Sequence, residues 1–155
     1  MALTIRPTTA DDWQRVRELR LEALADTPIA YAEHLADALT VDEAGWRMRA
    51  ARGASVAIDD DRWVGSMGGF VSPQGPMLVG VYVAPSHRGT SVAADLLAAI
   101  ETWARTQGDF LLLHVHEANA RAIAFYERSG YTKTGVVVPY VLDASANEFE
   151  MVKRF

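Results

Sequence analysis

The fold of this chain is decided by residues 81–93, which read VYVAPSHRGTSVA. The segment begins with apolar, β-branched residues typical of a buried strand, passes through a short loop, and continues into a helical pattern. A helix that begins directly after a strand presents unpaired N–H groups and a partial positive charge, which bind phosphate well. Gly89 permits a close backbone approach, and Arg88 adds N–H donors that suit phosphate oxygens. By itself the loop is a weak signal, because it lacks the P-loop and dinucleotide-binding signatures.

Size and composition limit the class of protein. The chain has 155 residues, within the usual range of about 100–200 residues for one domain, and we expect a single domain over residues 1–155. The absence of cysteine excludes disulfides, thiolate metal sites and a cysteine nucleophile. The net charge of −5 argues against a nucleic-acid-binding surface, and no apolar stretch suits a signal peptide or a membrane span. We therefore expect a cytoplasmic protein with no nucleic-acid or membrane partner.

Hydrophobic periodicity predicts the elements on either side of the central segment. Strands are expected at residues 3–6, 54–58, 62–72, 77–83, 110–116, 131–140 and 148–155, and helices at about 9–25, 40–51, 91–107 and 119–128. Residues 28–39 indicate a loop or a short broken helix, and residues 73–76 a turn. The strand at 110–116 is almost entirely apolar, so both of its faces should be covered. This order predicts an α/β fold, a mixed sheet with helices packed on it.

Two motifs together resemble those of the GNAT superfamily of N-acetyltransferases. Motif A of that family reads Gln/Arg-x-x-Gly-x-Gly/Ala after a strand, and residues 88–93 match its first and last positions with Arg88 and Ala93, while Ser91 replaces the middle glycine. Residues 119–131, NARAIAFYERSGY, are similar to motif B, one strand further along. The resemblance extends over about residues 77–132. It implies a mixed, mostly antiparallel, twisted sheet of about seven strands with about four helices.

The resemblance also implies an activity and a cofactor site. The activity is acetyl-CoA-dependent transfer of an acetyl group to the amine of a small molecule or peptide. Tyr126 is implied as the acid that protonates the leaving CoA thiolate, and Asn119 as both a helix cap and a cofactor contact. The implied acetyl-CoA-binding residues are Val81, Tyr82, Val83, Arg88, Gly89, Thr90, Ser91, Val92, Ala93, Ala94, Asn119 and Tyr126. The serine at position 91 is expected to weaken this site rather than abolish it.

The reaction needs a base, because an alkyl amine with a pKa near 10.4 is protonated at neutral pH. Relatives often carry a glutamate on the fourth or fifth strand, but residues 77–83 contain no carboxylate. His114, twelve residues before Tyr126, stands where relatives carry such a glutamate, and histidine is a suitable base near neutral pH. His114 is therefore the leading candidate and His116 the reserve. The sequence does not rank the further candidates Glu33, His34 and Glu117.

The acceptor site of the resembled family lies between the first helical region and the last two strands, here about residues 25–46 and 138–147. Four residues there could line it: Tyr31, His34, Trp46 and Tyr140. Each is also a candidate for simple core packing. The histidines lack the spacing of metal ligands, so no metal is expected. Two alternative functions stay open: a CoA-binding sensor or scaffold without turnover, and an acyltransferase that uses another short acyl-CoA. A homodimer is also possible, although no heptad or apolar edge in the sequence indicates an interface.

Overall fold

A computed structural model describes residues 2–155. Seven strands of this described part of the chain form one sheet in the order β1-β2-β3-β4-β5-β7-β6. The strands are β1 (Leu3–Pro7), β2 (Ser55–Asp59), β3 (Arg62–Ser72), β4 (Gly75–Val83), β5 (Phe110–His116), β6 (Thr132–Tyr140) and β7 (Asp143–Arg154). All neighbouring pairs are antiparallel except β4 and β5, which run parallel. The mixed, mostly antiparallel sheet is thus confirmed.

Within residues 2–155, five α-helices and three single-turn helices surround the sheet. The α-helices are α1 (Trp13–Asp26), α2 (Leu35–Ala38), α3 (Glu43–Ala51), α4 (Val92–Gln107) and α5 (Ala120–Arg128), and the single turns are Ala10–Asp12, Pro28–Ala30 and Pro85–His87. The four long helices match the four expected from periodicity, and α2 is a short turn within the segment expected to be broken. The side chains of Asp42 and Asn119 cap α3 and α5 by accepting from the N–H groups of Gly45 (2.9 Å) and Ala122 (3.3 Å).

The strand bounds differ from expectation at two hairpins. β7 begins at Asp143 rather than at residue 148, because it pairs with β6 directly after a tight turn, Tyr140 opposite Asp143. β4 begins at Gly75 rather than at residue 77, since Gly75 already pairs with Ser72. In both cases cross-strand pairing extends the strand through residues that are neither β-branched nor aromatic, namely 75–76 (GP) and 143–147 (DASAN).

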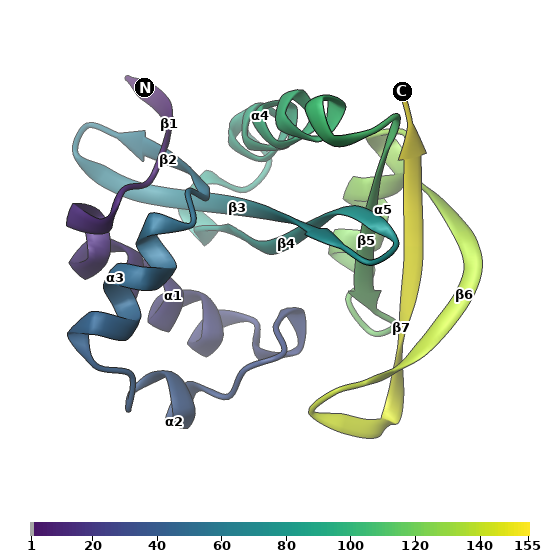
Figure 1. Ribbon diagram of the computed structural model, residues 1–155, viewed down its shortest axis with the longest axis horizontal. Coiled ribbons are helices and arrows are strands. Elements are labelled where there is room, and N and C mark those ends of the chain that lie inside the picture. The colour runs from purple at the N-terminus through teal and green to yellow at the C-terminus, as the bar shows by residue number, and fades with distance from the viewer. Residues whose placement is uncertain (1) are drawn as a thin grey trace.

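Helices cover both faces of the first half of the sheet. In Figure 1, α1 and α3 lie below β3 and β4, while α4 lies above them. The core between these layers contains Trp46 of α3, which is 1% exposed. α4 approaches β3 very closely at Gly69, where an added Cβ atom would lie 2.5 Å from the Trp103 ring. Glycine in this strand therefore serves close packing between helix and sheet.

The second half of the sheet turns away from the first. β4 and β5 pair only at Met77–Leu112 and Leu78–Leu113, close to the start of β4. Beyond that point β4 bulges away from its regular register with β3, at the positive-φ residue Gly80 (φ +62°). Figure 1 shows the result, with β3 and β4 running across the picture and β5 and β7 nearly vertical. The two parallel strands thus diverge in the middle of the sheet.

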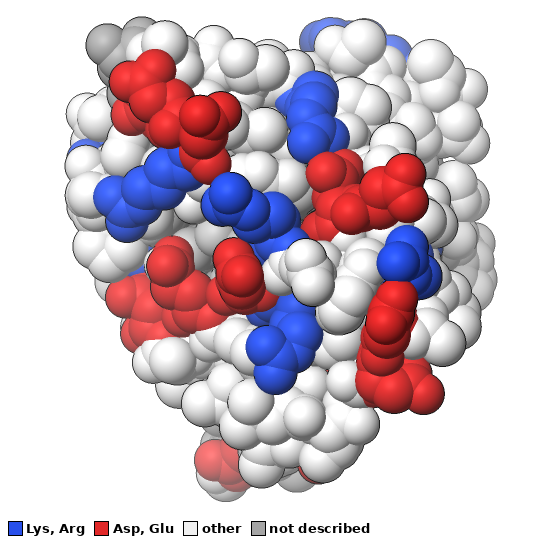
Figure 2. All heavy atoms as spheres, turned by 90° about the vertical axis from the view of Figure 1, so that its left-hand side faces the viewer, with Lys and Arg blue, Asp and Glu red and all other residues white. Residues whose placement is uncertain are grey.

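Charges on the face that carries the N-terminal part of the chain are mixed. Figure 2 shows acidic and basic side chains beside one another there, with no large patch of either sign. Ion pairs from this part of the chain include Arg6–Asp12 at 2.9 Å and Arg47–Glu43 at 2.8 Å. Within residues 2–155, no helix combines the length and the apolar character needed to cross a membrane.

Candidate functional site

A hollow of about 470 Å³ opens where β4 and β5 diverge. Its walls come from β3, β4, β5, α5 and the segment after α1, together with Glu148 of β7. The residues expected at the site that line this hollow are Tyr31, Val81, Tyr82, Val83, Arg88, Gly89, Ala93, His114, Asn119 and Tyr126, together with the reserve base His116. The fold therefore brings most of the two motifs and both histidines of β5 to one place.

The other expected residues do not line this hollow. Thr90, Ser91, Val92 and Ala94 belong to the loop before α4 and to its first turn. His34 is exposed, whereas Tyr140 is buried. Trp46 is buried and lines a second hollow of about 680 Å³ beside α1, α3 and β3, with its indole N–H donating to the Val41 carbonyl at 3.1 Å. On this geometry His34 and Trp46 are surface and core residues away from the histidines of β5.

The loop before α4 has the backbone expected of a phosphate-binding turn. Gly89 has a φ of +76°, which favours glycine. Ser91 has a φ of −73° and a ψ of −8°, an ordinary helical conformation, so the serine in place of the motif glycine causes no backbone strain. His87 anchors the loop, because its Nε2 lies 2.8 Å from the Asp59 carboxylate at the end of β2. The start of α4 is thus fixed with its first N–H groups pointing away from the helix.

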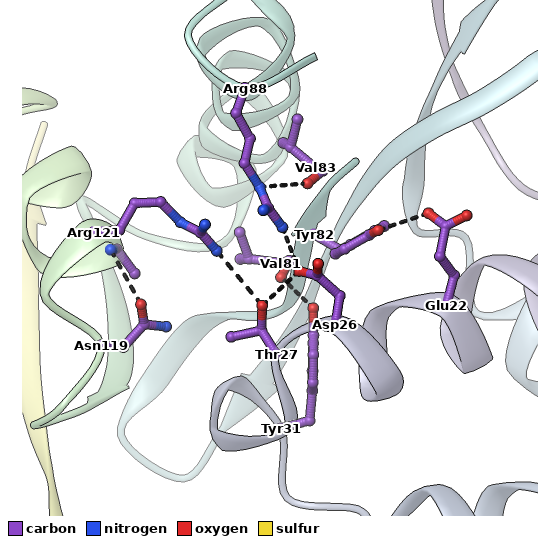
Figure 3. A network of polar contacts seen from close by, with 11 residues as sticks. Glu22, Asp26, Thr27, Tyr31, Val81, Tyr82, Val83, Arg88, Asn119 and Arg121 are labelled. Carbon is purple, nitrogen blue, oxygen red and sulfur yellow. Dashed lines mark hydrogen bonds and ion pairs between the residues drawn. The ribbon is translucent and has the colours of Figure 1, made fainter. Parts of the chain in front are cut away.

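Two arginines meet the end of α1 at this loop (Figure 3). Arg88 donates from Nε to the Val83 carbonyl at 3.0 Å, and its guanidinium forms an ion pair with Asp26. Arg121, from α5, donates to the Thr27 hydroxyl at 3.5 Å. The Thr27 hydroxyl and the Arg88 guanidinium hold the pKa of the Asp26 carboxyl below its ordinary value, so this carboxylate is charged at neutral pH. The cations of motifs A and B therefore converge on adjacent residues.

Tyrosine hydroxyls hold the segment after α1 against the sheet. Tyr31 donates to the Val81 carbonyl of β4 at 2.8 Å, and Tyr140 of β6 donates to the Tyr31 carbonyl. Tyr82 donates to Glu22 of α1 at 2.6 Å. Burial first of all raises the pKa of Tyr31 and Tyr82, so both hydroxyls stay protonated and keep donating. Tyr31 and Tyr140 thus position the wall of the hollow through their hydroxyl groups.

Tyr126 has a different environment from these tyrosines. Its side chain is buried and lines the hollow, and its hydroxyl forms none of the side-chain hydrogen bonds found within residues 2–155. Burial, with a smaller contribution from Tyr31, raises its pKa well above the ordinary value. The hydroxyl is therefore protonated at neutral pH and is free to donate to a group in the hollow.

His114 is held by a carboxylate from the neighbouring strand. Its Nε2 lies 3.2 Å from Glu150 of β7, and the other carboxylate oxygen of Glu150 accepts from the Thr134 hydroxyl at 2.9 Å. When Nε2 donates to Glu150, the neutral ring keeps its lone pair on Nδ1. This carboxylate–histidine arrangement fixes the tautomer and leaves one nitrogen able to accept a proton.

His116 has the opposite tautomer. Its Nδ1 accepts from the Ala118 N–H at 3.0 Å, so the proton of the neutral ring lies on Nε2. The ring is 8% exposed and packs edge-on against Tyr140 with centroids 4.8 Å apart. The nitrogen that remains is a donor, which makes His116 a poorer base than His114.

The family model described as Acetyltransferase (GNAT) family matches residues 13–131. The chain belongs to this family. A search of curated proteins returned no significant match.

Solved structures have the same GNAT fold at low identity. Ard1 from Thermoplasma volcanium is 21% identical, with a TM-score of 0.75 over 99% of this chain and 98% of that one. The paiA N-acetyltransferase from Thermoplasma acidophilum, in complex with coenzyme A, is 17% identical, with a TM-score of 0.77 over 100% of both chains. The yncA protein from Salmonella typhimurium, with acetyl-CoA, is 20% identical, with a TM-score of 0.76 over 99% of this chain and 94% of that one.

The remaining acids of this GNAT domain differ in availability. Glu33 is bound by Arg49 at 2.6 Å and by Arg20 at 3.0 Å. Although burial alone raises the pKa of Glu33, these hydrogen bonds bring it below the ordinary value, so Glu33 is a weak base. Glu117 is exposed and does not line the hollow.

Sequence reasoning missed Glu148 of β7, which does line the hollow. The one signal available was its alternation with Glu150 at the start of a predicted strand, which places both on one face. Within residues 2–155, no group of three His, Asp or Glu side chains is arranged to hold a metal ion.

Proposed function

We propose that this protein is an acetyl-CoA-dependent N-acetyltransferase that transfers an acetyl group directly to the amine of a small molecule or peptide. One observation carries the proposal: a single hollow is lined by Arg88 beside the start of α4, by the free hydroxyl of Tyr126, and by His114 on Glu150. The family match and the fold shared with structures that contain acetyl-CoA or coenzyme A support it.

The cofactor's phosphates belong at the start of α4. The first N–H groups of this helix and the Arg88 guanidinium offer donors and positive charge to a pyrophosphate. Arg121 and Asn119 lie on the other side, at the start of α5 (Figure 3). Because β5 does not pair with β4 beyond Leu78, the pantetheine arm has room between the two strands, and backbone N–H groups of β4 are available to the acetyl carbonyl.

Proton transfers follow from the tautomers and the burial described above. Nδ1 of His114, directly or through water, removes a proton from the ammonium of the acceptor. The neutral nitrogen then attacks the thioester carbon, the new C–N bond forms, and the C–S bond breaks. The nitrogen loses its second proton to water, and water later returns a proton to the Tyr126 oxygen. The Tyr126 hydroxyl donates its proton to the departing thiolate, and its raised pKa keeps that proton in place until then. The base and the acid thus come from β5 and α5, two elements that line one hollow.

The proposal is tested by calorimetric titration with acetyl-CoA, followed by a thiol-release assay with a panel of primary amines. Micromolar binding that Arg88→Ala weakens, together with release of CoA thiol that depends on an amine, is the expected result. Binding without turnover of any amine would instead indicate a CoA-binding sensor or scaffold. Faster turnover with propionyl-CoA or another short acyl-CoA than with acetyl-CoA would show that the protein is an acyltransferase for that other acyl group. No binding at all would refute the proposal.

A further inference from the structure

The charges that line the hollow are distributed unevenly. Its arginines are Arg20, Arg88, Arg121 and Arg128, whereas Glu148 is the only carboxylate that lines it in the part of the chain the structure describes. Two of the arginines already have anionic partners, since Arg20 binds Glu33 and Arg88 binds Asp26. Arg88, in the loop before α4, and Arg121, in the first turn of α5, lie where the proposed cofactor places its phosphates, and Arg128 is the last residue of α5. Glu148 therefore supplies the negative charge on the acceptor side.

Glu148 lies two residues before Glu150 on β7, and Glu150 is the residue paired with the proposed base His114. In the β5–β7 register, His114 is opposite Glu150 and His116 is opposite Glu148. Residues two apart in a strand point to the same face and are separated by about 7 Å. The pairs His114–Glu150 and His116–Glu148 therefore lie on one face of the sheet. Glu148 is about 7 Å from the His114–Glu150 pair, where the acceptor nitrogen loses its proton.

The two glutamates have different partners. Glu150 is occupied by His114 and Thr134, whereas the carboxylate of Glu148 has no ion pair or hydrogen bond to any residue from 2 to 155. His116, opposite it, is nine-tenths buried and has no partner at Nε2 within the same range. Because that Nε2 is a donor, His116 cannot accept from a cation, and Glu148 is left as the group that can.

We propose that Glu148 selects an acceptor with a second cationic group, so that the preferred substrate of this N-acetyltransferase is a short α,ω-diamine. The inference rests on the proposed function. One nitrogen loses its proton to His114 and is acetylated, while the other remains an ammonium ion and binds Glu148. Since carbon–carbon bonds are about 1.5 Å long, a spacer of about four or five methylene groups covers the separation of the two pairs. The apolar side chains of Met77 and Val79, which also line the hollow, suit such a spacer.

The test compares acceptors that differ only at the far end. We would measure kcat/KM with acetyl-CoA for 1,5-diaminopentane, 1-aminopentane and 5-aminopentanoate, and titrate the diamine into the CoA-bound protein by calorimetry. The expected order is diamine, then monoamine, then the acid, with a preference of roughly tenfold for diamine over monoamine, the size given by one charge-assisted contact. Glu148→Gln should abolish that preference, and Glu148→Lys should favour 5-aminopentanoate. Glu18→Gln, the same charge change at an exposed position of α1, should keep it.

Acetyl-CoA affinity, measured for each variant, shows that its fold is intact. A wild-type protein that acetylates the monoamine and the diamine equally well would overturn this inference and leave the proposed function standing. So would a diamine preference that survives in Glu148→Gln. Failure of the wild-type protein to bind acetyl-CoA or to acetylate any amine would overturn the proposed function and this inference with it.

Discussion

The guanidinium of Arg88 forms an ion pair with the carboxylate of Asp26, so the end of α1 holds the arginine of motif A. The next residue, Thr27, receives the Arg121 side chain from motif B. Both cations that face the proposed phosphate site are therefore in contact with two successive residues of one turn (Figure 3). That turn leads directly into the segment whose Tyr31 donates to β4. Residues 26–31 therefore contact both the proposed phosphate site, through Asp26 and Thr27, and β4, through Tyr31.

The first prediction concerns Asp26. Asp26→Asn should tighten acetyl-CoA binding by about twofold to fivefold, because a carboxylate beside Arg88 competes with the pyrophosphate, and partly exposed ion pairs contribute about 1 kcal/mol or less. Calorimetry at low and high salt measures the effect, which should be larger at low salt. Arg88→Ala is the matched control and should weaken binding. Weaker binding in Asp26→Asn would show that Asp26 positions Arg88 for the cofactor.

The second prediction concerns the hydroxyl of Tyr126. Tyr126→Phe should lower kcat by about 10²- to 10⁴-fold, the range for loss of a general acid, and should leave the dissociation constant of acetyl-CoA within about twofold. The phenyl ring keeps the packing, and the Tyr126 hydroxyl forms no hydrogen bond within residues 2–155 that the variant would lose. Tyr131→Phe removes the hydroxyl of a neighbouring buried tyrosine and should retain activity. An equal loss of kcat and cofactor affinity in Tyr126→Phe would assign Tyr126 a structural role.

The third prediction separates the base from the group that orients it. His114→Gln should lower kcat/KM by about 10²-fold or more, because it removes the nitrogen that accepts the proton. Glu150→Gln keeps a hydrogen-bonding oxygen but removes the charge, so it should lower kcat/KM less. His116→Gln is the matched control and should retain most of the activity, since the free nitrogen of His116 is a donor. A large loss of kcat/KM in His116→Gln but not in His114→Gln would exchange the roles of the two histidines.

The sequence was sufficient for most of the fold because its signals are local. The strand–loop–helix of residues 81–93, the caps at Asp42 and Asn119, and the apolar run at 110–116 each depend on neighbours in the chain. The hairpin that lengthens β7 back to Asp143 depends on pairing with β6, because residues 143–147 (DASAN) contain none of the β-branched or aromatic residues that mark a strand.

The sequence predicts the position of the candidate site as far as its two motifs extend. Tyr126, Arg88 and His114 line one hollow as the motif spacing indicates. The partners that decide their chemistry come from distant elements: Asp26 from α1 and Glu150 from β7. The same applies to Glu148, whose place is set by the β5–β7 register. The register between two strands cannot be predicted from local sequence, so these partners could be identified only from the folded structure.

The last prediction concerns stability and pH at the start of the chain. Arg6 of β1 binds both carboxylate oxygens of Asp12 at 2.9 Å, and this contact lowers the pKa of Asp12 to about 2 from its ordinary value of 3.8. Asp12 also accepts from the Thr9 N–H at 2.8 Å, so it ties β1 to the turn that leads into α1. Asp12→Asn should therefore lower the free energy of unfolding at pH 7 by about 1 kcal/mol.

The pKa of Asp12 is lower in the folded chain than in the unfolded one, so the folded state gains from its ionisation. That gain is complete above about pH 4 and is lost as the pH falls toward 2. Urea unfolding of the wild type and Asp12→Asn at pH 7, 4, 3 and 2 should thus show a difference that shrinks steadily over the last three values. Asp11→Asn, at a fully exposed neighbour, should differ from the wild type by less than about 0.5 kcal/mol throughout. A difference for Asp12→Asn that is the same at every pH would mean that packing of the turn, rather than the charge of Asp12, stabilises this end of the chain.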